Sequence, residues 1–251
     1  MRALRVLLIV VVILGGLFVI ADRVAVNFAE NEAADRVRAS EGLHQNPDVS
    51  IKGFPFLTQL AGGRFDDVQI GIDNYDLPPA DGKSSAGRSQ PMRIDRLTAE
   101  MHGVSFSGDY SAATAQRADG TAHISYAELL KAARTQPVQL VPGLVSAQVV
   151  GLSDGGNGKI KLDIKASVRG VPLSRHFPVM SSVKVQGETV SVTAVGLPKL
   201  PVPAGEKEVR SVTDFSEQLA GLPAGLKLDK IEAVSDGVDI SVTGKDVRLS
   251  R

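Results

Sequence analysis

The stretch GFPFLTQLAGGRFDDV, residues 53–68, combines a rigid apolar corner with the start of a strand. Pro55 restricts its own φ angle and favours an extended conformation at Phe54, so the rings of Phe54 and Phe56 are predicted to be held at a fixed angle to each other. A Gly-Gly pair then ends a short helical turn, and Phe65 leads into alternating apolar residues. The corner is predicted either to seat one strand on another in the core or to border a binding groove.

Upstream of the corner, two arginines precede an uncharged apolar run, residues 6–21. The run is shorter than the ~20 residues that usually span a bilayer and slightly longer than a signal-peptide core. An amphipathic pattern continues through Val24, Phe28 and Val37, which favours an uncleaved signal-anchor over a cleaved signal peptide at residues 1–23. The arginines predict a cytoplasmic N-terminus, with the rest of the chain extracytoplasmic in the cell envelope.

Downstream of the corner, apolar segments separated by turns rich in Gly, Asp, Ser and Asn predict antiparallel strands. Segments of this kind are 49–52, 68–75, 94–101, 145–152, 160–168, 183–185 and 190–195. Residues 76–91, DLPPADGKSSAGRSQP, contain almost no apolar side chain and are predicted to form a surface loop. Residues 197–203, LPKLPVP, are predicted to form an extended connector.

Two amphipathic helices are predicted. Ser125 and Glu128 have the spacing of a capping box at the start of the first, whose apolar stripe includes Leu129 and Leu130. The second is predicted at 211–220, with Phe215 and Leu219 on one face.

Each helix is followed by a predicted hairpin, at 146–167 and at 227–244, and both hairpins contain a Ser-Asp-Gly turn. The fold class that these elements predict is α+β: elongated, with long curved antiparallel sheets wrapped around a few amphipathic helices and an apolar groove or tunnel. Residues 24–251 are predicted to form one domain, with possible subunits at 24–120 and 121–251.

Composition excludes several classes of function. The 28 basic residues equal the 28 acidic ones, so no positive excess attracts nucleic acid, and the absence of cysteine excludes thiolate chemistry. The four histidines are widely separated, and GVSFSG, residues 103–108, has one residue too many for a hydrolase elbow. We therefore predict no catalytic residues, no metal site, no cofactor and no enzymatic activity.

The N-terminal signal-anchor, the run VSIKGFPFLTQLAGGRFDDV at residues 49–68 and the units of helix and hairpin resemble the LmeA-like phospholipid-binding proteins of actinobacterial cell envelopes. The resemblance covers most of the chain after residue 22 and is most specific in GFPFLTQL and GRFDDV. It implies an envelope protein, similar in build to tubular lipid-binding domains, that holds a phospholipid, the phosphatidylinositol type among the candidates. The family is implicated in glycolipid assembly, and the pathway here stays open.

A non-catalytic lipid carrier needs an aliphatic interior and export from the cytoplasm, and it needs no nucleophile. Each methylene of an acyl chain that is buried in such an interior contributes about 0.8 kcal/mol to lipid binding. The large apolar side chains of the corner and the two helices are the predicted lipid-binding residues. They are Phe54, Phe56, Leu57, Leu60, Phe65, Leu129, Leu130, Phe215 and Leu219. The alternative is a structural envelope adaptor that binds a protein partner through a sheet edge and holds no lipid.

Overall fold

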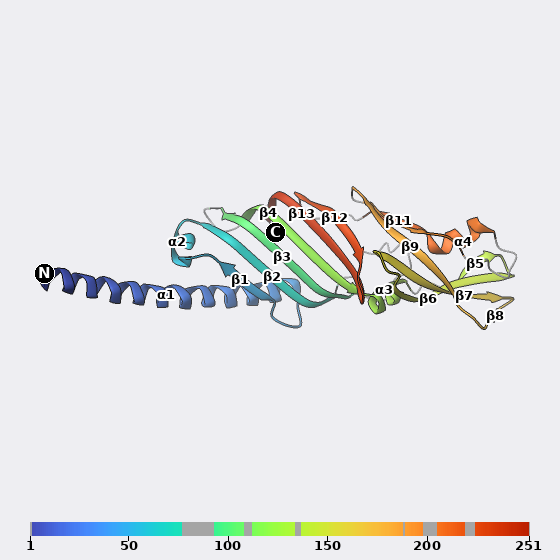
Figure 1. Cartoon of the computed structure of the whole chain (residues 1–251), viewed down its shortest axis with the longest axis horizontal. Coiled ribbons are helices and arrows are strands. Elements are labelled where there is room, and N and C mark those ends of the chain that lie inside the picture. Colours follow the sequence, from blue (N-terminus) through green and yellow to red (C-terminus); the bar gives the residue numbers. More distant parts are fainter. Residues whose placement is uncertain are drawn as a thin grey trace.

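The computed structural model describes residues 2–76, 93–107, 112–133, 137–187, 189–197, 205–218 and 224–250. The molecule is elongated, and one long helix, α1 (Arg2–Glu41), projects from one end of the body and then runs along it (Figure 1). Two antiparallel sheets lie one after the other along the long axis (Figure 1).

The first sheet has six strands and lies next to α1. Its order is β1 (Asp48–Lys52), β2 (Arg64–Asp76), β3 (Arg93–Phe106), β4 (Ala112–Ser125), β13 (Gly237–Ser250) and β12 (Leu226–Ala233). Every pair in it is antiparallel. The last two strands of the chain therefore return to the sheet that contains the first four.

The second sheet forms the end of the molecule far from α1 (Figure 1). Its order is β11 (Phe215–Gln218), β10 (Thr189–Ala194), β9 (Phe177–Gln186), β7 (Lys159–Val168), β6 (Val145–Asp154) and β5 (Val138–Val141), with β8 (Val171–Pro172) paired to β7. The other helices in the described part of the chain are α2 (Phe56–Ala61), α3 (Tyr126–Ala133) and α4 (Glu206–Thr213).

Each sheet is apolar on one face, as β7 illustrates. Ile160, Leu162 and Ile164 alternate with Lys161 and Asp163, and only the aliphatic residues are buried. Successive side chains of a strand point to opposite faces, so this pattern puts the aliphatic face on the core and the charged face in solvent. The predicted class, α+β with curled antiparallel sheets and an apolar N-terminal helix, is confirmed.

Two hydrophobic clusters stabilise the body. One, in the second sheet, is centred on the buried residues Val145, Ile164 and Phe177. The other lies where α1 meets the corner and contains Phe56 and Phe65. α3 joins the two sheets, because it follows β4 directly, leads towards β5 and packs on the second-sheet cluster.

The prediction of a helix at residues 211–220 is wrong. The helix there, α4, ends at Thr213, and Phe215 begins strand β11, whose partner is β10. Asp214 leaves the helical conformation and its side chain accepts a hydrogen bond from the backbone N–H of Ala194, 2.9 Å away. This bond to β10 directs the chain into the sheet. The predicted hairpins at 146–167 and 227–244 are confirmed, but they belong to different sheets.

The prediction for α1 is correct in extent, but of the three residues in its predicted amphipathic pattern only Val37 is half-buried. Val24 and Phe28 are exposed, whereas Val26 and Ala34 are buried against the body. Strand β4, which the sequence did not predict, lies between β3 and β13. The possible division at residue 120 falls inside β4 and does not separate the sheets. The predicted loop and connector lie outside the described residues, apart from Asp76, which ends β2, and Leu197.

Candidate functional site: an apolar groove

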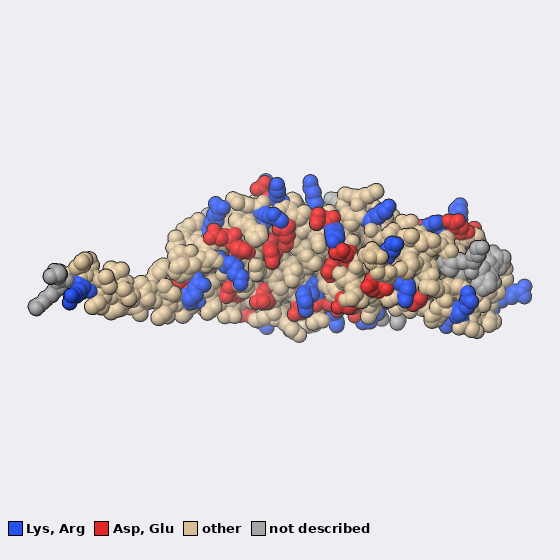
Figure 2. Space-filling view, viewed as in Figure 1, with Lys and Arg blue, Asp and Glu red and all other residues tan. Residues whose placement is uncertain are grey.

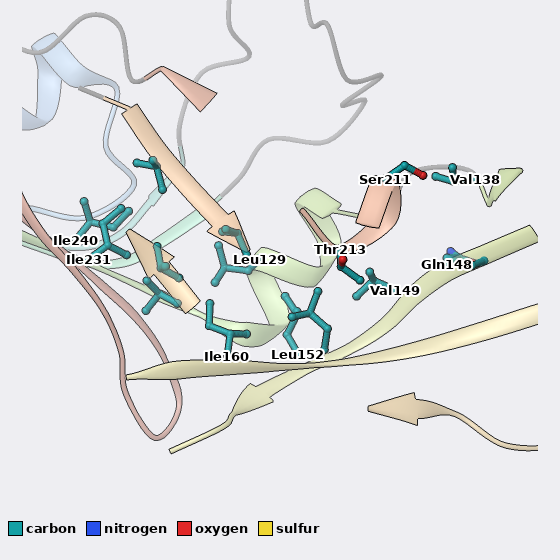
Figure 3. A pocket seen from close by; sticks show the side chains of 16 residues that line it. Leu129, Val138, Gln148, Val149, Leu152, Ile160, Ser211, Thr213, Ile231 and Ile240 are labelled. Atoms are coloured by element: carbon teal, nitrogen blue, oxygen red, sulfur yellow. The ribbon is translucent and has the colours of Figure 1, made fainter. Parts of the chain in front are cut away.

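A groove of about 340 Å³ lies between the second sheet, α3, α4 and the end of the returning hairpin β12–β13 (Figure 3). Thirteen of its sixteen lining residues are aliphatic and none is charged. The aliphatic lining consists of Leu129, Val138, Ala147, Val149, Leu152, Ile160, Leu162, Val183, Val190, Val192, Ile231, Val238 and Ile240. The volume falls within the range of about 300–1,000 Å³ that is usual for small-molecule sites.

The pairing of β6 with β7 brings Val149 and Leu152 to the same side of the groove. In β6 a bulge between Val149 and Gly151 shifts the pairing with β7, so that Leu152 lies opposite Leu162. Without the extra residue, Val149 and Leu152 would point to opposite faces, since side chains alternate along a strand. The bulge therefore places both side chains in the groove.

The polar lining is limited to Gln148, Ser211 and Thr213. The hydroxyl of Ser211 donates to the carbonyl oxygen of Glu208 at 2.6 Å, and that of Thr213 donates to Asp214 Oδ1 at 2.8 Å. Because both hydroxyl hydrogens are used within or next to α4, these two residues add little polarity to the groove.

Asp214 fastens α4 beside the groove. Burial alone would raise the pKa of Asp214, but the hydrogen bonds from the Ala194 N–H, the Thr213 hydroxyl and the Arg210 guanidinium outweigh it and lower that pKa. The carboxylate is thus held in its charged form, and it links the end of α4 to β10.

From the groove, an aliphatic row of side chains extends across the first sheet. One row of directly paired residues crosses five strands and is aliphatic throughout: Ile72, Leu97, Ala122, Ile240 and Ile231. All five are half-buried, and the last two line the groove. Paired residues of antiparallel strands share a face, so the row is one aliphatic track leading into the groove.

A second row runs beside the first and consists of Ile70, Ala99, Gly120, Val242 and Leu228. Strands are about 4.8 Å apart, so five of them span about 19 Å. A bilayer's hydrocarbon core is about 30 Å thick, so one acyl chain extends about 15 Å. The aliphatic track is therefore long enough for an acyl chain.

Of the predicted lipid-binding residues, only Leu129 lines the groove. Leu130 is half-buried on the same helix. Phe215 begins β11, and Leu219 lies outside the described residues.

The corner residues lie at the opposite end of the first sheet. Phe56 is 1% exposed and stacks on Phe65, with ring centroids 5.7 Å apart, and Leu57 packs half-buried against the same cluster. Phe54 and Leu60 are exposed. The structure thus does not bring the corner and the helices into one site, and Phe56 has the environment of a core residue.

Most of the groove lining was not predicted as a site from the sequence. The lining strands β6, β7 and β10 were predicted, but Ile231 and Ile240 enter the groove because the last hairpin returns to the first sheet. Among the described residues, no group of three or more histidine, aspartate or glutamate side chains is placed to hold a metal ion.

α1 is long and apolar enough to cross a membrane, and the large apolar side chains of its first twenty residues are exposed. No curated protein and no solved structure matches the chain. A model of the LmeA-like phospholipid-binding family matches residues 20–243, which include the corner, the second sheet, all of the first sheet except the end of β13, and the aliphatic track that ends in the groove. The chain therefore belongs to the LmeA-like phospholipid-binding family.

Proposed function

We propose that this protein is a non-catalytic phospholipid-binding protein of the bacterial cell envelope that holds an acyl chain in the groove and along the aliphatic track. α1 anchors it in the membrane, and the two arginines before the apolar run favour an orientation with the body outside the cytoplasm. The observation that carries the proposal is the uncharged, aliphatic lining of the groove. The family membership supports phospholipid as the ligand class.

The physical basis is the burial of hydrocarbon. Each methylene removed from water contributes about 0.8 kcal/mol, so a chain of a dozen methylenes is retained without any charged contact. The same lining has no charged side chain that could act as a general base or bind a metal, and the hydroxyls of Ser211 and Thr213 already donate to Glu208 and Asp214, which favours holding a lipid over transforming it. Lipids of the phosphatidylinositol type are candidates, and the process served would be envelope glycolipid assembly or lipid transfer.

The test is to fill the groove. Val149 on β6 and Val190 on β10 line the groove and are half-buried. Replacing both with tryptophan in a double variant would direct two indole rings into the groove. Val171 and Val195 are exposed apolar residues outside the groove, and the corresponding double tryptophan variant is the matched control.

Both variants would be purified as full-length chains from the same cells, and extracted phospholipid per protein would be measured together with the melting temperature. We expect the groove variant to lose most of its phospholipid while it melts close to the control. Equal phospholipid content in two folded variants would overturn the proposal and leave the structural adaptor as the better account.

A further inference from the structure

The corner is tied to α1 at the first two residues after the apolar run. Asp22 is fully buried, and its Oδ1 accepts a hydrogen bond from the backbone N–H of Leu57, 2.9 Å away, in the first turn of α2. The neighbouring Arg23 donates to the carbonyl oxygen of Gly53 at 3.5 Å. Because the first N–H groups of a helix have no partner inside it, Asp22 satisfies one of them from another helix. The corner cannot move away from the end of the apolar run without breaking these bonds.

An exposed aromatic ring lies at this junction. Phe54 is 58% exposed although it follows a buried strand, and the Arg23 guanidinium lies 5.3 Å from the centre of its ring. Leu60 on α2 is also exposed, as are Val24 and Phe28 on the face of α1 that points away from the body. In Figure 2 the surface of the projecting α1, uncharged beyond the basic group near its tip, continues onto the adjoining end of the body.

We propose that this corner docks on the surface of the bilayer that holds α1, with Phe54 in the interfacial layer and Arg23 at the lipid phosphates. The inference rests on the proposed anchoring by α1. Asp22 and Arg23 lie within about 3 Å of Ala21 along the helix axis. The interfacial layer on each side of the hydrocarbon core is about 5–7 Å thick, so Arg23 and the ring beside it fall inside this layer.

The chemistry of the pair fits this position. Phenylalanine side chains bury at the boundary between headgroups and acyl chains in segments that lie on a membrane, and an arginine buries its methylenes there while its guanidinium reaches the phosphates. Phe56, one residue past Pro55, is buried in the core cluster and cannot take this role. The corner therefore divides its two phenylalanines between the bilayer surface and the interior of the protein, and it orients the body relative to the membrane.

The experiment uses the absence of cysteine from the chain, which makes every introduced cysteine a unique labelling site. Three single variants, Phe54→Cys, Val171→Cys and Val12→Cys, would be labelled in the full chain with an apolar aromatic, environment-sensitive fluorophore and reconstituted into vesicles. At residue 54 the fluorophore takes the place of the phenylalanine ring. Val171 is an exposed apolar residue at the far end of the molecule, and Val12 lies in the apolar run (Figure 1). Quenching by phospholipids that carry a nitroxide near the headgroup or deep in the acyl chain reports the depth of each probe.

We expect the deep nitroxide to quench the Val12 probe and the shallow nitroxide to quench the Phe54 probe several-fold more than the Val171 probe. Quenching at Val12 with equal, weak quenching at the other two positions would overturn docking and leave the anchor intact. An unquenched Val12 probe would overturn the anchor and docking with it.

A fourth label tests the role of the ring itself. Leu60→Cys leaves Phe54 in place, and the same label in a Phe54→Ser background removes the ring from an exposed position. We expect the serine background to lower shallow quenching at residue 60 at an unchanged melting temperature. Unchanged quenching would show that the ring does not hold the corner on the membrane.

Discussion

Phe54 and Phe56 are separated by one proline and have opposite environments. The ring of Phe56 is fully enclosed, whereas that of Phe54 meets solvent and one guanidinium. The sequence predicted that Pro55 holds the two rings apart, but it could not tell which of them is buried. That choice follows from the position of Phe65, which stacks on Phe56 from the next strand.

We expect Phe56→Ala to lower the free energy of unfolding by about 3–5 kcal/mol, the usual loss for a buried phenylalanine. Phe54→Ala loses an exposed contact with Arg23 and should cost less than about 1 kcal/mol. Denaturant unfolding of both full-length variants in the same detergent measures the difference. Similar losses for the two variants would contradict the burial of Phe56 alone.

Asp214 makes stability depend on pH. Its pKa in the folded protein is lower than its ordinary value of 3.8, since three hydrogen bonds outweigh the effect of burial. A lowered pKa contributes stability that is present above the unfolded pKa and lost as pH falls through the folded pKa. We therefore expect the free energy of unfolding to decrease below about pH 4.

The control for this effect is Asp214→Asn, which keeps a side-chain acceptor for the Ala194 N–H and removes the titrating group. The variant should be less stable than the native chain at neutral pH, and the difference should shrink as the pH falls below 4. A difference between the two proteins that is constant over this range would show that Asp214 does not titrate with folding.

At the scale of elements, the short helix α2 depends on α1 for its N-terminal hydrogen bond. α2 has six residues and follows Pro55, which makes no side-chain capping bond. Asp22 supplies the missing acceptor to Leu57. A helix this short is not stable alone, so its contact with α1 and the core cluster maintains it.

We expect Asp22→Ala to lower the melting temperature and to speed hydrogen exchange at the N–H of Leu57, because the bond to the carboxylate is lost. Asp22→Asn keeps an oxygen acceptor and should have a smaller effect on the same amide. Hydrogen exchange followed by mass spectrometry of the peptide that contains α2 makes the comparison. Equal exchange in all three proteins would contradict the role of Asp22.

At the scale of the whole molecule, the proposed anchor and the groove occupy opposite parts of a long body (Figure 1). The twenty residues of α1 after Ala21 extend about 30 Å along the first sheet, at 1.5 Å per residue. The aliphatic track crosses that sheet and ends in the groove, while the cluster of Phe56, Phe65 and Phe106 fills the end near the corner. This arrangement separates the surface proposed to meet the bilayer from the site proposed to hold lipid.

The apolar run is the first part of α1, and the hydrogen bond between Asp22 and Leu57 ties the same helix to the folded body. We expect the mature protein to keep residues 1–21 and to stay in the membrane fraction after alkaline washing of cell membranes. Mass spectrometry of the purified N-terminus checks the first expectation. A mature chain that begins at Asp22 would contradict anchoring.

The sequence alone determined the helix at the N-terminus, the helix after Ser125 and most strands. Each of these has a strong local signal: a long uncharged run, an amphipathic stripe or alternation of apolar residues bounded by glycine-rich turns. The run at residues 49–68 also pointed to the family, because a proline between two phenylalanines followed by Gly-Gly is specific over a short stretch.

Only the tertiary structure decided β4, β11 and the groove. β4 contains Ala118, Gly120 and Ala122, which have low strand propensity, yet hydrogen bonds from β3 on one side and β13 on the other make it a central strand. The local sequence around Phe215 predicts a helix, but Phe215 lies in a strand because its segment pairs with β10. The groove needs Ile240, about ninety residues after Val149, to return to the same site. Such pairings between distant segments leave no local signal, because their energy comes from partners that the chain meets only when folded.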